Sequence, residues 1–330
     1  MSPHHGSVAG TRILVTGASG FLGAALVQRL VSRGAIVAAL SRTRGRLMVE
    51  EGFQFFPCDL TDLPAATQAF ACFGPEMLFH FAAHPDGAES YSQACHSIQT
   101  NTLITLNTLE AFRLAKGQLF VYGDSSKVYG DCAVPYRAAM LPRPLSSYGI
   151  AKVAGWELCE LYRRLHRIST VSLRPTIIYG PRQAYNLVTY VVNCVLSGKT
   201  GVVLDGGSQT RDPLYIDDAT AAFVAVAERG KQLQGQIINL GGGKEYTIRD
   251  LTEIMLQLMG VKLEVIVAKE RVRPTDTRRS HCDNAESTPL LGWKPVVSLR
   301  EGLLRTVQHL LEKQPLPVQT QVRQATIVGQ

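Results

Sequence analysis

The stretch Thr16-Gly17-Ala18-Ser19-Gly20-Phe21-Leu22-Gly23 follows the short apolar run at 12–16 and opens a segment with helical periodicity at 21–33. Glycines at 17, 20 and 23 allow a tight turn and a close approach of the backbone to a pyrophosphate. The helix N-terminus then directs N–H groups and the positive end of its dipole at the phosphates. A glycine triplet alone is weak evidence, but here a strand and a helix flank it as the mechanism requires. The sequence therefore predicts a dinucleotide site formed by Gly17, Ser19, Gly20, Phe21, Leu22 and Gly23.

Short apolar runs alternate with amphipathic segments along the first half of the chain. The expected strands lie at 12–16, 36–40, 53–56, 77–83, 119–122 and 170–173, and the expected helices at 21–33, 102–114 and 148–164. This alternation is typical of a parallel sheet covered by helices on both faces. The sequence therefore predicts an α/β fold with a Rossmann-type, doubly wound parallel sheet.

The pattern changes from about residue 182 onward, where short strands at 201–204 and 236–239 mix with helices at 217–229 and 247–259. This change predicts a smaller C-terminal α/β lobe that binds the substrate. We expect a flexible N-terminus at 1–11, a mainly dinucleotide-binding Rossmann domain with the catalytic residues at 12–181, a mainly substrate-binding lobe at 182–313, and a disordered tail at 314–330.

Composition excludes several classes of protein. The chain has 330 residues and a net charge of +7, but its basic residues are dispersed and form no continuous face with interleaved aromatics, so we expect no nucleic-acid partner. Its apolar stretches are too short to span a bilayer, so we expect no membrane partner. Seven scattered cysteines without a C-x-x-C pair favour reduced thiols in a cytoplasmic protein over a disulfide framework or a metal site.

The residues after the second and third expected strands bear on the choice of cofactor. NAD-selective sites usually place an Asp or Glu after the second strand, where this chain has Ser41 and Arg42. A guanidinium pairs well with a ribose 2′-phosphate, which favours NADP(H), although Arg42 could also stack on adenine and NAD(H) stays possible. Asp59, followed by Leu60, is placed to accept from the adenine amino group or, alternatively, to cap a helix.

Tyr148 and Lys152 are the central chemical signal. Four residues apart on a helix, the two side chains share one face. A nearby ammonium lowers the pKa of a phenol, so the tyrosine can exchange a proton with a sugar hydroxyl or ketone near neutral pH. The lysine can also hydrogen-bond the nicotinamide ribose. Alone the pair means little, but it follows the glycine turn, and Ser125 lies between them.

The chain resembles the extended short-chain dehydrogenase/reductases, in the group of nucleotide-sugar epimerases, dehydratases and reductases. The resemblance extends over about residues 12–311. It is carried in order by the motifs 16–23, 58–60, 80–83, 125–130, 148–152, 173–175 with 179–181, 209–212 and 291–293.

The resemblance implies roles for individual residues. Ser125 would hydrogen-bond the reacting sugar oxygen, Tyr148 would act as the acid/base, and Lys152 would tune it and hold the ribose. Ala82 and Ala83 would line the cofactor trough. Relatives also pair into homodimers, so we expect a homodimer.

The resemblance also implies contacts to a nucleoside-diphosphate sugar. Arg211 and Arg273 would hold the diphosphate, which suits their forked donors, and Asp276 would contact the nucleoside ribose. Asn186 and Leu187 would pin the nucleotide, and Ser126 and Lys127 would lie next to the sugar. The chain departs from its relatives at Ile177, where many carry an asparagine.

The reaction stays open at this level. A 4,6-dehydratase places a carboxylate directly after the catalytic hydroxyl residue, whereas this chain has Ser126 and Lys127 there, so a dehydratase would need an unusual role for Lys127. A 4-epimerase would retain its NAD(P), and a 4-ketoreductase would consume NADPH. The absence of an acid at Ser41 favours NADPH-dependent reduction of a 4-keto sugar nucleotide, with the epimerase as the alternative. A non-catalytic NADP-sensing protein would have no need for Ser125, Tyr148 and Lys152 together.

Overall fold

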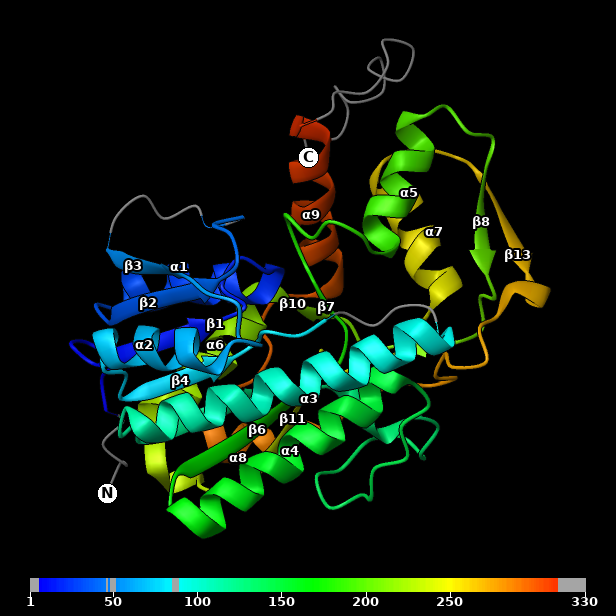
Figure 1. Ribbon diagram of the computed structural model, residues 1–330. Coiled ribbons are helices and arrows are strands. Elements are labelled where there is room, and N and C mark those ends of the chain that lie inside the picture. The colour runs from blue at the N-terminus through cyan, green and yellow to red at the C-terminus, as the bar shows by residue number, and fades with distance from the viewer. Residues whose placement is uncertain (1–5, 46, 48–51, 85–88, 314–330) are drawn as a thin grey trace.

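The computed structural model describes residues 6–45, 47, 52–84 and 89–313. A seven-stranded sheet forms its centre, with the strand order β11-β6-β5-β4-β1-β2-β3 (Figure 1). Every neighbouring pair in this sheet is parallel. The strands are β1 (Arg12–Thr16), β2 (Ile36–Ser41), β3 (Phe53–Pro57), β4 (Met77–His80), β5 (Leu119–Gly123), β6 (Ser169–Pro175) and β11 (Ile237–Leu240).

Helices cover both faces of the sheet. One layer contains α1 (Phe21–Ser32), α6 (Ile216–Arg229) and α8 (Ser287–Leu291), and the other contains α2 (Leu63–Phe73), α3 (Tyr91–Leu114) and α4 (Ser147–His166). Successive side chains of β1 point to opposite faces of the sheet. Ile13 and Val15 pack against the first layer of helices, and Leu14 packs against the second. The predicted doubly wound α/β fold is therefore confirmed.

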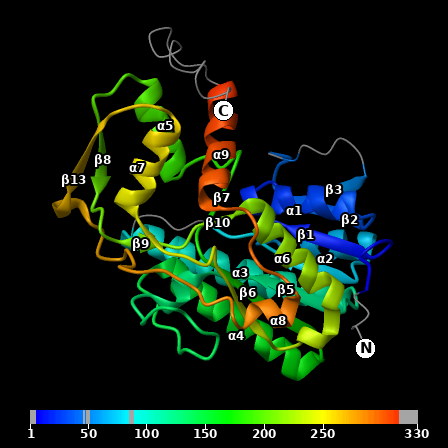
Figure 2. The same ribbon diagram turned by 180° about the vertical axis from the view of Figure 1, so that it is seen from behind.

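A smaller lobe follows the sheet domain along the chain (Figure 2). Its core joins the side chains of three helices, α5 (Leu187–Leu196), α7 (Ile248–Leu258) and α9 (Leu299–Lys313), with those of β8 (Gly201–Asp205). Strand β8 pairs in parallel with β13 (Glu264–Ala268). The remaining elements are β7 (Ile178–Tyr179), β9 (Thr210–Arg211), β10 (Leu214–Tyr215), β12 (Tyr246–Thr247) and the short 3-10 turns η1 (Ser126–Tyr129), η2 (Gly230–Leu233) and η3 (Lys269–Arg271).

Two segments differ from their sequence predictions. The helix expected at 102–114 begins at Tyr91, because Ser90 caps a polar first half that shows no apolar periodicity. The strand expected at 77–83 ends at His80. The backbone of Phe81 makes the last ladder bond, to the carbonyl of Thr16, and the next N–H, that of Ala82, donates to the Thr16 hydroxyl instead of a strand carbonyl.

The division into parts at 12–181 and 182–313 stays a prediction. Strand β11 and helices α6 and α8 come from the second range but pack on the main sheet. The first five residues and the tail at 314–330 lie outside the described residues. Within the part of the chain that the structure describes, none of the helices has the length and apolar content needed to cross a bilayer.

Candidate functional site

A cleft of about 1090 Å³ lies between the carboxyl ends of the central strands and the C-terminal lobe. It brings together most of the residues predicted from the sequence. Those that line it are Gly17, Gly20, Phe21, Leu22, Gly23, Ala83, Ser125, Ser126, Lys127, Tyr148, Lys152, Asn186, Leu187, Arg211, Arg273 and Asp276. Ser19, Ser41, Arg42, Asp59, Leu60 and Ala82 are not among the lining residues.

The glycine turn has the geometry that a pyrophosphate requires. Gly17 has φ +64°, and a Cβ on it would lie 2.6 Å from the backbone nitrogen of Ala82. A Cβ on Gly23 would lie only 2.3 Å from the carbonyl oxygen of Gly17. Helix α1 begins directly after Gly20 without a side-chain cap, which leaves its first N–H groups facing the cleft for a ligand. These residues therefore fit a dinucleotide.

A buried histidine secures the segment that faces this turn. His80 hydrogen-bonds the hydroxyl of Thr16 at 2.8 Å and that of Thr105 at 3.2 Å. Burial, together with the smaller effect of the Lys152 charge, lowers the pKa of His80 to about 3, so the ring is neutral at physiological pH. The same Thr16 hydroxyl accepts from the backbone of Ala82, which keeps the small Ala82–Ala83 segment close to the glycines.

The residues that the sequence predicts to contact the adenosine lie at the ends of β2 and β3. Ser41 is buried and donates to the carbonyl of Thr43, whereas Arg42 is exposed. The carboxylate of Asp59 accepts from the backbone and hydroxyl of Thr61, which lowers its pKa, and Arg42 lowers it further. The cap of helix α2 is Asp62, so Asp59 is not the helix cap that the sequence also allowed.

Tyr148 and Lys152 lie in the first turns of α4, which is capped by Ser146. The Lys152 ammonium lies 5.6 Å from the centre of the Tyr148 ring and donates to the carbonyl of Gly123 at 2.6 Å. Burial lowers the pKa of Lys152 to about 8, while the nearby Asp124 carboxylate opposes this shift. An ammonium this close to the phenol stabilises the phenolate, which is what an acid/base tyrosine requires.

Ser125 follows β5 at the carboxyl edge of the sheet. Its hydroxyl oxygen accepts from the backbone of Lys127 at 3.2 Å, so the hydroxyl proton can be donated to a ligand. Lys127 is half-buried and Ser126 is buried, and both line the cleft. Across from them Ile177 presents an apolar surface that is 42% exposed, so it supplies no polar side-chain contact.

The predicted substrate contacts come from distant parts of the chain. Arg211 in β9 forms an ion pair with Asp276 and donates to the carbonyl of Thr277 at 2.9 Å. Arg273 is exposed on the same segment as Asp276. Asn186 caps α5 by accepting from the backbone of Thr189 at 2.8 Å, so the structure gives it a local role beside its predicted one.

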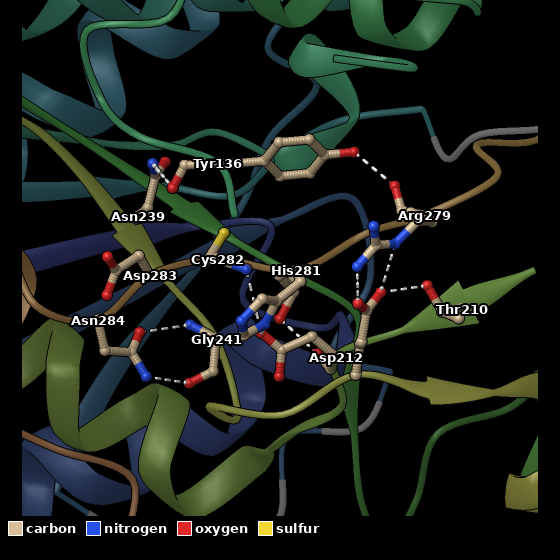
Figure 3. Close-up of polar contacts among 12 residues, drawn as sticks. Tyr136, Thr210, Asp212, Asn239, Gly241, Arg279, His281, Cys282, Asp283 and Asn284 are labelled. Atoms are coloured by element: carbon tan, nitrogen blue, oxygen red, sulfur yellow. Dashed lines mark hydrogen bonds and ion pairs between the residues drawn. The ribbon is translucent and has the colours of Figure 1, made fainter. Parts of the chain in front are cut away.

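A buried aspartate tethers the segment that carries Arg273 and Asp276 (Figure 3). Asp212 directly follows Arg211, and its carboxylate accepts from His281 at 3.0 Å and from the backbone of Cys282 at 3.1 Å. This hydrogen bond raises the pKa of His281. The tether couples the positions of the two arginine-bearing segments.

Several lining residues are not among the site residues that the sequence predicted. Arg271, on the same segment as Arg273, is the third guanidinium in the cleft beside those of Arg211 and Arg273. Asp124 also lines the cleft and directly precedes Ser125. Gln183, Tyr185, Tyr190 and Asp205 complete the side of the cleft formed by the lobe. No motif marks these positions. Among the described residues no cluster of histidine, cysteine or acidic side chains has the arrangement of a metal site, and all seven cysteines are free.

Comparison with known proteins gives a consistent picture. The model of the NAD dependent epimerase/dehydratase family matches residues 13–241. A UDP-glucose 4-epimerase of Mycolicibacterium smegmatis is 34% identical over 315 residues, which cover 92% of this chain and 99% of that protein. The structure of a UDP-glucose 4-epimerase from Thermotoga maritima with UDP-glucose has a TM-score of 0.85 at 28% identity, covering 92% of this chain and 99% of that one. A Bacillus cereus UDP-glucuronic acid 4-epimerase in complex with UDP-glucuronic acid and NAD has a TM-score of 0.83 at 28% identity and covers 92% and 100%.

The parallel sheet and its glycine turn, together with these similarities, define a nicotinamide-dinucleotide-dependent enzyme with a Rossmann fold. Within that class, the chain belongs to the NAD dependent epimerase/dehydratase family of extended short-chain dehydrogenase/reductases.

Proposed function

We propose that this protein is a nucleotide-sugar 4-epimerase that oxidises and re-reduces C4 of a nucleoside-diphosphate sugar while retaining its cofactor. The observation that carries this proposal is that Ser125, Tyr148 and Lys152 share one cleft with Arg211 and Arg273. One end of the cleft therefore has proton-transfer groups, and the other has cations for a diphosphate. The near full-length similarity to UDP-glucose 4-epimerases supports the same reaction.

In the proposed reaction each side chain has one task. Tyr148 takes the proton of the 4-hydroxyl group and later returns it, while the Lys152 ammonium stabilises the phenolate between these steps. The Ser125 hydroxyl hydrogen-bonds the reacting oxygen and holds it near the tyrosine. A nicotinamide dinucleotide held at the glycine turn would supply the hydride acceptor for C4 and then the hydride donor to its opposite face, so C4 would be inverted without net oxidation.

The residues after Ser125 support an epimerase over a dehydratase. Elimination of water needs a second acid/base pair beside the sugar. Ser126 and Lys127 line the cleft at that place, and neither carries a carboxylate.

A second candidate is the NADPH-dependent reduction of a 4-keto sugar nucleotide. The observation that favours it is the end of β2, where the buried Ser41 is followed by the exposed Arg42. In this reaction NADPH held at the glycine turn would supply the hydride to C4 and be released in its oxidised form, and Tyr148 would protonate the forming alkoxide.

One experiment separates these reactions. The cofactor that co-purifies is released and identified, and the protein is then incubated with a panel of nucleotide sugars. The panel includes nucleotide-linked uronic acids, because the Lys127 ammonium would pair with a carboxylate.

Interconversion of C4 epimers without net cofactor consumption supports the proposal. Stoichiometric loss of NADPH with a 4-keto substrate would replace it by the reductase, and loss of water from a saturated sugar would replace both. Absence of any turnover would favour a sensing protein.

The cofactor preference is a separate prediction, since an epimerase can retain either dinucleotide. We expect NADP(H) to bind more tightly than NAD(H), and we expect Arg42→Ala to weaken NADP(H) by about tenfold, the effect of one charge-assisted hydrogen bond. Fluorescence titration of cofactor-free protein measures both. Arg44→Ala is the matched control, because Arg44 lies over the rings of Phe53 and Phe55 instead. Equal or NAD-favouring affinity would contradict the prediction.

The substrate class gives the next prediction. Arg273→Ala removes a guanidinium that we expect to contact the diphosphate. The variant should therefore bind nucleoside diphosphates about tenfold more weakly, while its affinity for the dinucleotide should change little. Calorimetric titration with UDP and other nucleoside diphosphates measures this loss. Arg278→Ala is the control, since its side chain is 91% exposed and does not line the cleft. Arg211→Ala should have the same effect, but it also breaks the pair with Asp276. A true substrate without any diphosphate would refute the assignment.

We also propose a homodimer formed through α3 and α4. These long helices lie side by side on the sheet (Figure 1), and their outer surfaces expose leucine and isoleucine side chains. The exposed residues are Ile98, Leu103, Leu106, Leu114, Ile150, Leu161 and Leu165. A twofold pairing of the two helices with those of a second copy would bury this apolar surface.

Light scattering coupled to gel filtration tests the dimer. We expect twice the chain mass for the wild type and the mass of one chain for Leu103→Glu/Leu161→Glu, because two charges would then enter the apolar contact. Leu141→Glu is the control, as Leu141 is 78% exposed on a loop outside α3 and α4. A wild-type monomer, or a double variant that remains dimeric, would exclude this interface.

The thiols support a cytoplasmic location, which we infer here. All seven cysteines are free, and Cys58, Cys159, Cys194 and Cys282 are buried. Scattered thiols of this kind are typical of proteins kept in a reducing compartment.

A further inference from the structure

A buried ion pair lies directly beneath the candidate catalytic residues. The carboxylate of Asp124 and the guanidinium of Arg174 are 0% and 1% exposed, and the Oδ2 and Nε atoms are 2.6 Å apart. Taking both charges out of water is costly, and apolar residues of similar shape often serve stability equally well. Stability alone therefore gives no reason for this pair at this place.

The pair connects three elements around Ser125. Asp124 directly precedes Ser125 and accepts its backbone N–H at 2.8 Å through Oδ1, while Oδ2 also accepts from the hydroxyl of Ser172 in β6. Arg174 donates to the hydroxyl of Tyr129 in η1, which in turn donates to Asn239 in β11. The carboxylate is thereby held in one orientation, and so is the backbone of Ser125.

Asp124 is also the charge that acts on Lys152, whose ammonium donates at 2.6 Å to the carbonyl of Gly123, the residue directly before Asp124. Burial lowers the pKa of Lys152, and Asp124 raises it. The other titratable groups around Lys152 are uncharged at neutral pH: burial lowers the pKa of His80 in β4, and raises those of Tyr122 in β5 and Cys159 in α4. Tyr148 is the remaining neighbour, on the same helix. Among the described residues, Asp124 is therefore the anion that supports the ammonium.

We propose that Asp124 is a positioning residue of this enzyme: its buried carboxylate, held by Arg174, keeps Lys152 in the ammonium form beside Tyr148 and fixes the backbone of Ser125. The inference rests on the proposed roles of Tyr148 and Lys152, and it applies equally to an epimerase and a reductase. Through Lys152, Asp124 sets the pH range over which the phenolate is stabilised.

The test measures the protonation of Lys152 directly, in the cofactor-bound protein. Isotopically labelled lysine gives side-chain NMR signals that titrate with pH, and the signal of Lys152 is assigned by its loss in Lys152→Met. In Asp124→Asn the titration of Lys152 should move to lower pH by about one unit or more, because the carboxylate that favours the ammonium is removed. Ser172→Ala, which removes a hydrogen bond but no charge, should leave the titration where it is.

A second variant covers the case in which Asp124→Asn does not fold because Arg174 is left unpaired. Asp124→Asn/Arg174→Gln carries no unpaired buried charge, and its Lys152 titration should also move to lower pH. An unchanged titration of Lys152 in either folded variant would overturn the proposal.

Turnover gives an independent readout. The alkaline limb of the pH–rate profile should move to lower pH in the folded Asp124 variants, whereas a purely structural defect would lower turnover at every pH without moving the limb. If Tyr148→Phe proves fully active, the proposed function fails, but the lysine titration still reports on Asp124. The two failures are thus distinguishable.

Discussion

Replacing Tyr148 with phenylalanine is expected to reduce turnover by about two orders of magnitude or more, the usual effect of losing a positioned proton donor. The substitution removes only the hydroxyl group, and the ring is half-buried at the wall of the cleft, so folding should be retained. Lys152 remains near the ring, but without its hydroxyl group the ring has no proton to exchange with the sugar.

The measurement is kcat on the nucleotide sugar that the wild type turns over best. Cofactor affinity should stay within a few-fold of the wild type, so the loss falls on the chemical step. Tyr91→Phe is the matched control, since Tyr91 is 86% exposed at the start of α3, away from the cleft. Near-normal turnover in Tyr148→Phe would show that another group exchanges the proton.

The second large effect is expected from Gly23→Ala. Its new methyl group would lie 2.3 Å from the carbonyl oxygen of Gly17 and 2.9 Å from the Cα of Ala18. Both contacts are with backbone, so helix α1 must move away from the glycine turn. Overpacking of this kind costs about 1–3 kcal/mol, which corresponds to roughly a 5- to 150-fold loss of dinucleotide affinity if the strain falls on the bound state.

Cofactor content after purification and fluorescence titration together measure this loss, and circular dichroism checks the fold. Gly6→Ala is the control, because a Cβ at Gly6 would meet only the carbonyl oxygen of Glu228, at 3.5 Å. Unchanged cofactor content in Gly23→Ala would mean that the pyrophosphate does not approach this turn.

Sequence alone predicted the parts of the fold that depend on local patterns. The turn at 16–23 could be recognised because its glycines, the strand before it and the helix after it are consecutive in the chain. The Tyr148–Lys152 pair was also predictable, since helical geometry places residues four apart on one face. Both patterns need no knowledge of distant contacts.

Helix α3 shows where local patterns are insufficient. Its first half contains polar residues such as Ser97 and Asn101, which make no apolar stripe. Asn101 accepts from the backbone of His84 and donates to the hydroxyl of Ser97, so tertiary contacts satisfy these groups within the helix. The expected start at residue 102 was therefore wrong, because periodicity detects only apolar packing.

Only the tertiary structure decided the arrangement of charges in the cleft. Arg211 pairs with Asp276 across 65 positions of sequence, and Asp124 pairs with Arg174 across 50. Likewise, β11 could be recognised as a strand from its apolar run, but its place beside β6 in the central sheet could not. The physical reason is the same in each case: strand order and side-chain pairing depend on how separate elements pack, and that packing brings together residues with no common local pattern.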